Sequence, residues 1–137
     1  MTDHINLEIV TPEKIVARES AQIVMAPGIN GEFGVLHGHT PFLTTLKVGI
    51  LHYKDIKGTE RFVFINGGFA EALPDKVTIL TESAERRRDI DLNRAKQAFN
   101  RAQDRLNNQK ENIDYTRAKA SMLRAIHRIK IAESKSL

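Results

Sequence analysis

The chain has 137 residues, of which 41% are hydrophobic and 28% charged, with a formal net charge of +4 and no cysteine. This length allows one domain, or a small domain with an appendage, and the composition argues against global disorder. The lack of cysteine excludes disulfides, thiolate metal sites and a cysteine nucleophile.

The first part of the chain is predicted to form short β-strands. Ile5, Leu7 and Ile9 alternate with polar residues, which is the period-two pattern of a strand with one buried face. Further apolar segments lie at 15–17, 23–25, 46–48, 50–53, 62–65 and 77–80. Turn signals separate them at Pro27-Gly28, Asn30-Gly31, Lys57-Gly58, Asn66-Gly67-Gly68 and Pro74-Asp75. Many short strands at this spacing predict a β-sandwich or barrel over residues 1–85.

Residues 86–137 are predicted to form a two-helix hairpin. All eight glycines and all four prolines precede residue 75. Two apolar stripes at helical spacing follow, Leu92-Ala95-Phe99-Ala102-Leu106 and Ala118-Met122-Ala125-Ile129-Ala132. Asp91 and Asp114 are the candidate N-caps. The polar connection between the stripes is short, so the helices should pack antiparallel.

The charge is unevenly divided between these two regions. Residues 1–85 hold 7 basic and 11 acidic side chains, whereas residues 86–137 hold 14 basic and 6 acidic ones. A basic tail on an acidic body indicates an acidic partner or an anion, or only a soluble helix rich in lysine and arginine. Two helices alone are marginally stable in water, so the hairpin is expected to need a further packing partner and to be able to open.

The glycine-rich segment 27–34 is interpreted as a structured turn or binding loop. It lacks Gly-Lys-Ser or Gly-Lys-Thr, and the charge of Glu32 would repel phosphate. His37 and His39 have no third ligand at a suitable spacing, so we assign them to a surface or interface loop rather than to a metal site. The remaining histidines indicate no site: His4, His52 and His127. No catalytic motif is found, so catalysis is disfavoured.

Four arginines lie beside the predicted helical stripes, two on each helix: Arg94, Arg101, Arg124 and Arg128. In an antiparallel hairpin they can face one groove, where guanidinium groups would bind a polyphosphate through paired hydrogen bonds. Glu85 and Asp91 could accept hydrogen bonds from a base or ribose. The residues alone leave the alternative open, which is a solvated basic face with ion pairs inside each helix.

Three segments of the chain resemble ATP synthase epsilon subunits. The first contains Gly31-Glu32-x-Gly34-Val35-Leu36 followed by His39-x-Pro41. The second is Gly67-Gly68-Phe69-Ala70 followed by Val77-Thr78-Ile79-Leu80, and the third is Ile90-Asp91-x-x-Arg94-Ala95. Their order and spacing match over essentially the whole chain, although His37 stands where many members carry proline.

The resemblance implies a non-catalytic rotor subunit of a proton-translocating F-type ATP synthase. The sandwich would bind the gamma subunit and the ring of c subunits, with four residues at this contact: Gly31, Glu32, His37 and His39. The chain would lie at the cytoplasmic face of the bacterial cell membrane, held there through the complex. Consistently, the sequence has no apolar run that could span a bilayer and no signal-peptide pattern.

The resemblance also implies that the hairpin is regulatory and that no cofactor is required. Folded on the sandwich, the hairpin permits turnover; extended along gamma into the alpha and beta subunits, it inhibits ATP hydrolysis. In some bacterial members the folded hairpin binds ATP as an effector. The chain matches that site at six positions: Glu85, Asp91, Arg94, Arg101, Arg124 and Arg128.

Two functions of other classes compete with this interpretation. The basic helices could form a nucleic-acid-binding module, but Phe99 and Tyr115 are the only aromatic residues there and Phe99 lies in the buried stripe. We therefore expect no nucleic-acid partner. A stand-alone enzyme with a ligand-binding sandwich is the second alternative, and co-purification with gamma and the catalytic head would count against it.

Overall fold

The computed structural model describes residues 3–108 and 112–134, and the chain divides into two compact units, Met1–Arg87 and Arg88–Leu137. The expected boundary between residues 85 and 86 falls inside the last strand of the first unit, β7 (Ala84–Arg86). This strand pairs with β5 (Glu60–Leu73), and the Arg86 Nε donates a hydrogen bond to the Val16 carbonyl at 3.0 Å. Arg86 is therefore held by the strands.

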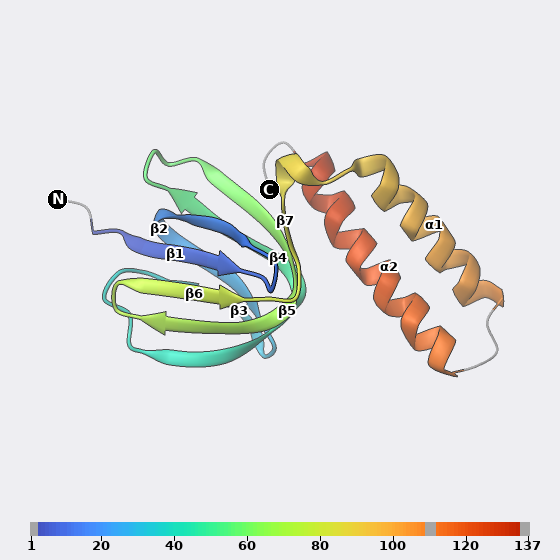
Figure 1. The fold of residues 1–137 in the computed structure, drawn as a ribbon, viewed down its shortest axis with the longest axis horizontal. Helices are drawn as coiled ribbons and strands as arrows, with labels where there is room; N and C mark the ends of the chain where they lie inside the picture. The colour runs from blue at the N-terminus through green and yellow to red at the C-terminus, as the bar shows by residue number, and fades with distance from the viewer. Residues whose placement is uncertain (1–2, 109–111, 135–137) are drawn as a thin grey trace. The chain divides into compact units, whose positions relative to one another are not determined.

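The described part of the first unit contains six further strands besides β7, and the 3₁₀ helix η1 (Arg87–Asp89) follows β7. The six strands are β1 (Ile5–Val10), β2 (Ile15–Gly28), β3 (Gly31–Val35), β4 (Phe42–Asp55), β5 (Glu60–Leu73) and β6 (Lys76–Leu80). Neighbouring strands follow the order β1-β6-β5-β4-β2-β3, and β1 also pairs with β2, so the sheet closes on itself (Figure 1). The predicted β-sandwich or barrel is confirmed.

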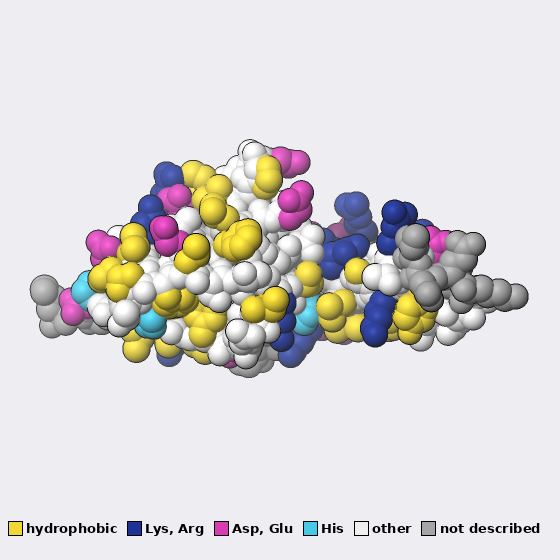
Figure 2. Space-filling view, turned by 90° about the horizontal axis from the view of Figure 1, so that it is seen from below, with side chains coloured by type: hydrophobic (Ala, Val, Ile, Leu, Met, Phe, Trp, Pro, Cys, Tyr) yellow, Lys and Arg dark blue, Asp and Glu magenta, His cyan; other side chains and the backbone are white. Residues whose placement is uncertain are grey.

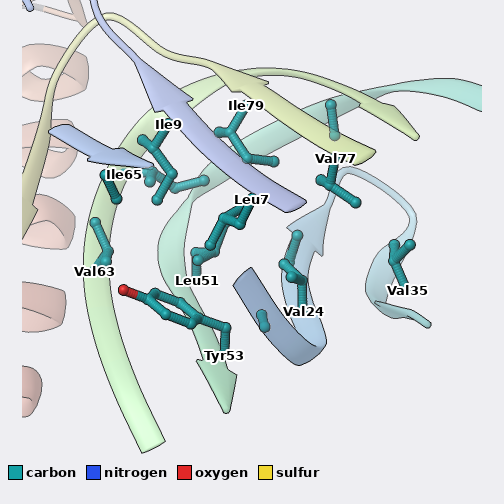
Figure 3. Packing of buried hydrophobic residues seen from close by; sticks show 14 of the residues in the cluster. Leu7, Ile9, Val24, Val35, Leu51, Tyr53, Val63, Ile65, Val77 and Ile79 are labelled. Atoms are coloured by element: carbon teal, nitrogen blue, oxygen red, sulfur yellow. The ribbon is translucent and has the colours of Figure 1, made fainter. Parts of the chain in front are cut away.

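The core of this unit comes from the side chains on the inner faces of the strands. Ile5, Leu7 and Ile9 are at most 1% exposed, as their alternation predicted. They meet apolar residues of the other strands in one continuous cluster, including Val24, Leu51, Val63, Ile65, Val77 and Ile79 (Figure 3). Burial of this apolar surface is the main contribution to the stability of the unit.

Two predicted turns are wrong, because β2 continues through Pro27-Gly28 and β5 continues through Asn66-Gly67-Gly68. Gly67 and Gly68 have φ values of 75° and 117°, which only glycine adopts without strain. A Cβ atom at Gly68 would also collide with the Leu80 carbonyl of β6. The glycines therefore form an irregularity within a long strand, and they place the β5 backbone close against β6.

The second unit contains α1 (Leu92–Asn108) and α2 (Asn112–Glu133), which run antiparallel and contact each other (Figure 1). The Asp91 carboxylate accepts a hydrogen bond from the Arg94 amide at 3.1 Å, which confirms Asp91 as the N-cap of α1. Asp114 lies in the first turn of α2 and not before it, so its prediction as an N-cap is wrong. Its charge still favours this helix end, because the N-terminus carries the positive end of the helix dipole.

Candidate functional sites

The first candidate site is an open cavity of about 330 Å³ beside the β2–β3 hairpin. The resemblance places four residues at the contact with gamma and the c-ring. Three of them line this cavity, namely Gly31, Glu32 and His39. Gly31 has a φ of 133°, which lets the chain reverse between the two strands at little cost. The hairpin thereby brings Glu32 to the surface, where its side chain is 53% exposed.

Aromatic rings stiffen this cavity. Phe42 makes edge-on contacts with Phe33 and with His39, at centroid distances of 5.3 and 4.8 Å. The His39 Nδ1 lies 2.6 Å from the Thr40 carbonyl oxygen. A carbonyl can only accept, so Nδ1 carries the proton and donates. The site therefore combines a carboxylate, an imidazole and exposed apolar edges, which suits contact with another protein.

His37 lies apart from this cavity. Its Nδ1 is 3.9 Å from the Asp3 carboxylate, and the neighbouring Gly38 amide donates a hydrogen bond to the Pro74 carbonyl at 2.6 Å. These contacts attach the β3–β4 loop to the N-terminal segment and to the β5–β6 turn. The structure thus brings Gly31, Glu32 and His39 together and places His37 outside the cavity lining.

His52 contacts Glu32, although no sequence pattern indicated a role for it. The His52 Nε2 on β4 lies 3.3 Å from the Glu32 carboxylate on β3. Alternation along β4 places His52 on the outer face of the sheet. Its partner depends on the strand order, in which β2 separates β3 from β4, and no local pattern in the sequence encodes that order.

A second candidate site is an apolar groove of about 520 Å³ at β1, β5 and β6. Phe69 pairs with Leu80, and Leu80 pairs with Val10, so the three side chains form a row across neighbouring strands. Phe69 is 53% and Leu80 50% exposed. Figure 2 shows hydrophobic side chains spread over the surface of the sandwich. Exposed apolar rows of this kind are typical of protein–protein contacts.

The third candidate site lies along the helical hairpin, whose seam is defined by four buried alanines: Ala95, Ala102, Ala118 and Ala125. Ala102 and Ala118 each lie six residues from the connecting ends of their helices, and Ala95 and Ala125 each lie thirteen. The antiparallel seam therefore pairs alanines at two levels. Such small side chains allow the helix axes to approach closely.

All arginines in the described part of the two helices flank this seam on one edge. They are Arg94, Arg101, Arg105, Arg117, Arg124 and Arg128. Each stands one residue before or three residues after a seam alanine, and these positions lie on the same side in an antiparallel pair at 100° per residue. Lys96, Lys119 and Lys130 fall on the other side. Arg105 and Arg117 were missed by the sequence analysis, which did not use the seam as its reference.

Local contacts already engage some of the residues predicted to bind a nucleotide. The Asp91 carboxylate caps α1, and the Arg124 guanidinium donates to the Ser121 hydroxyl at 3.0 Å. Arg94 and Arg101 are exposed, whereas Arg124 and Arg128 are half-buried. Glu85 belongs to β7 of the sandwich unit, while the other five predicted residues belong to the helical unit. Figure 2 shows basic side chains clustered over the helices.

The described residues contain neither a candidate metal site nor a candidate membrane-spanning helix. No group of three or more histidine, aspartate or glutamate side chains within residues 3–108 and 112–134 has an arrangement that could hold a metal ion. In the same part of the chain, neither helix combines the length and the apolar character needed to cross a membrane.

Comparison with known proteins identifies the family. Residues 4–87 match the family model of the ATP synthase delta/epsilon chain β-sandwich domain, and residues 88–133 match that of its long α-helix domain. The ATP synthase epsilon chain of Desulforapulum autotrophicum is 55% identical over 98% of this chain and 100% of its own length. That of Desulfatibacillum aliphaticivorans is 58% identical over 100% of this chain and 97% of its own length.

Solved structures share the fold at lower identity. A chain of the Euglena gracilis mitochondrial ATP synthase superposes with a TM-score of 0.83 at 22% identity, covering 96% of this chain and 82% of its own. A chain from the Tetrahymena thermophila ATP synthase central stalk and c-ring gives a TM-score of 0.64 at 14% identity, covering 93% and 96%. The matches to both domains and to the curated relatives show that this chain belongs to the epsilon-chain family of ATP synthase.

Proposed function

We propose that the chain is a non-catalytic rotor subunit of an F-type ATP synthase, with a sandwich that binds the gamma subunit and the c-ring. The observation that carries this proposal is the apolar row of Phe69, Leu80 and Val10, of which Phe69 and Leu80 are exposed, on a member of the epsilon family. Apolar side chains that face water are unfavourable, so a partner that covers this row lowers the free energy. We assign the row to the gamma subunit, the shaft of the rotor.

The test is a charge placed inside this row. Phe69→Glu should weaken binding to a catalytic head that contains gamma but lacks this subunit by more than tenfold, since a buried unpaired carboxylate costs well over about 1.4 kcal/mol. Ile56→Glu is the matched control, because Ile56 is 55% exposed and lies on the β4–β5 turn. Equal affinities for the two variants, measured by surface plasmon resonance, would reject the docking site.

The cavity with Glu32 and His39 is assigned to the c-ring. It differs from the apolar row in presenting a charged side chain on a hairpin stiffened by Phe33 and Phe42. A rotor subunit has to transmit torque, and a stiff contact with both the shaft and the ring serves that purpose. The subunit would then stay at the cytoplasmic face of the bacterial membrane as a peripheral part of the proton-translocating complex.

The hairpin is assigned a regulatory role with two positions. Folded, it permits ATP hydrolysis; extended along gamma between the alpha and beta subunits, it inhibits hydrolysis. The seam between α1 and α2 consists largely of alanines, which bury little apolar area, so separating the two helices from each other has a low cost. The arginine edge favours insertion next to acidic segments of the head, and this attraction should weaken with salt.

ATP is proposed as the effector that favours the folded position. The fit rests on chemistry, because several guanidinium groups on one edge can donate to the phosphate oxygens. Arg94, Arg101, Arg124 and Arg128 would hold the phosphates, while Glu85 and Asp91 would contact the base and ribose. A ligand that binds only the folded form shifts the population by its differential affinity. Low ATP would then release the inhibitory form.

A further inference from the structure

The His52 ring on β4 lies between two carboxylates that come from two other strands. Its Nε2 is 3.3 Å from a Glu32 oxygen on β3, and its Nδ1 is 3.6 Å from a Glu60 oxygen on β5. β2 runs between β3 and β4 and pairs with both. The Glu32 contact therefore bridges two inter-strand spacings, or about 10 Å of sheet, and links the exposed hairpin to the central strands.

Both ring nitrogens of His52 face carboxylate oxygens, and the Nε2–Glu32 contact is the one within hydrogen-bond distance. A neutral imidazole has one N–H donor, whereas the imidazolium has two. Ionised carboxylates can only accept, so the Nε2 that faces Glu32 carries a proton and donates in either form. The ring also stacks on Phe62, with a centroid distance of 5.8 Å and an interplanar angle of 21°. Phe62 thus fixes the plane in which the two nitrogens point.

The exposed fractions show that His52 is the most firmly held of the three side chains. The His52 side chain is 28% exposed, whereas Glu32 and Glu60 are 53% and 42% exposed. Glutamate has three rotatable side-chain bonds, so an exposed carboxylate on a hairpin would otherwise sample many positions. The stacked ring restricts this freedom for the one acidic group that lines the cavity assigned to the c-ring.

We propose that His52 is a positioning residue for Glu32, which it holds in the orientation presented to the c-ring. The inference rests on the proposed function, because it gives Glu32 the contact with the ring. His52 itself would act through Glu32, and Glu60 would act only as the second carboxylate beside the ring. Loss of His52 would then weaken ring binding although the Glu32 carboxylate is still present.

The test measures the affinity of the complete head, carrying variants of this subunit, for membranes that retain the c-ring but lack the head. His52→Ala should weaken binding about two- to fivefold, which is the range expected for a partly exposed ion pair. Glu32→Gln should weaken it at least as much, and the double variant should be no weaker than Glu32→Gln alone. His52→Arg should retain most of the affinity, because guanidinium can donate to both carboxylates.

Two controls separate positioning from a general loss of structure. Arg18→Ala removes another partly exposed ion pair, with Glu8 at 3.0 Å on β1 and β2, and should leave the affinity unchanged. His52→Gln also removes the imidazole, but it loses less packing against Phe62 than His52→Ala does. In the isolated full chain, the Glu32 side-chain carboxyl NMR resonance should move in His52→Ala and in His52→Gln at constant melting temperature.

The outcomes distinguish this inference from the function on which it rests. Additive effects of His52→Ala and Glu32→Gln, or an unmoved Glu32 resonance, would overturn the positioning role while the ring contact stands. No effect of Glu32→Gln on membrane binding would overturn the ring contact at Glu32, and the positioning role would fall with it. Docking on gamma through Phe69 would be untouched by either result.

Discussion

The Asp55 carboxylate at the end of β4 accepts a hydrogen bond from the Arg61 Nε of β5 at 3.1 Å, and so joins two 14-residue strands across their turn. The same carboxylate accepts hydrogen bonds from the backbone amides of Lys57 and Thr59, each at 2.9 Å. Asp55 therefore fixes both the turn and the register of the hairpin.

Asp55→Ala is expected to lower the melting temperature of the full chain by several degrees, because the two turn amides lose their acceptor. Differential scanning calorimetry measures the change. Arg18→Ala, which removes the ion pair with Glu8, should leave the midpoint nearly unchanged. Equal shifts in the two variants would show that Asp55 is an ordinary surface charge.

The Asp55 pair also predicts the effect of acid. The Thr59 amide lowers the pKa of Asp55 most, burial opposes it with the second-largest effect, and the Arg61 side chain and Lys57 amide add further lowering, so the pKa lies below its usual value. The carboxylate thus contributes stability above its unfolded pKa of about 4. That contribution disappears as the pH falls through the lower folded pKa. Asp55→Asn should therefore have a flatter stability profile than the wild type below about pH 4, in urea titrations at successive pH values.

Tyr53 predicts the alkaline limit of the sandwich. Burial, and then the neighbouring Glu19 carboxylate, raise the pKa of Tyr53 well above its ordinary value of about 10. The folded state thus keeps the phenol neutral, and its stability should fall once the unfolded tyrosine ionises above about pH 10. In a Tyr115→Phe background, Tyr53 is the only tyrosine.

The absorbance of tyrosinate near 295 nm should then rise only when the circular dichroism of the sandwich is lost. A rise above pH 10 with the fold still intact would contradict the burial of this hydroxyl. Tyr53→Phe should reduce the alkaline loss of stability, with Tyr115→Phe alone as the control for a more exposed ring.

The alanine seam predicts a size limit at the hairpin interface. Ala118→Leu should destabilise the helical unit by about 1–3 kcal/mol, because extra methyl groups overpack a close helix pair. Ala120→Leu makes the same substitution at an exposed position of α2 and should change stability by less than about 0.5 kcal/mol. Thermal melts followed at 222 nm compare the two, and equal effects would mean that the seam has been misplaced.

Much of this fold follows from local sequence pattern, because the periodicity of Ile5, Leu7 and Ile9 and the helical spacing of Ala95 and Ala102 each reflect one buried face. Gly67 and Gly68 were wrongly interpreted as a turn, because a turn and an irregularity within a strand both require positive φ. Only the pairing with β6 decides between them. The contact of His52 with Glu32 could not be predicted from the sequence for a related reason, since it depends on which strands become neighbours.

The nucleotide site predicted on the hairpin can be tested through the affinity of the chain for ATP. Arg94→Ala or Arg124→Ala should weaken ATP binding to the isolated subunit about tenfold or more, since each removes charge-assisted hydrogen bonds. Lys96→Ala, on the opposite side of the seam, should bind as the wild type does. Calorimetry that finds no binding to the wild type at millimolar ATP would reject the site altogether.

The most direct test of the whole account compares the full chain with a chain ending at Ile90, each added to a catalytic head that lacks this subunit. Both forms should bind gamma with the same affinity, because the sandwich core and the Phe69 row are complete without the helices. Only the full chain should lower the rate of ATP hydrolysis, severalfold at low ATP. A truncated chain that fails to bind, or one that inhibits as strongly as the full chain, would contradict the division between a docking sandwich and a regulatory hairpin.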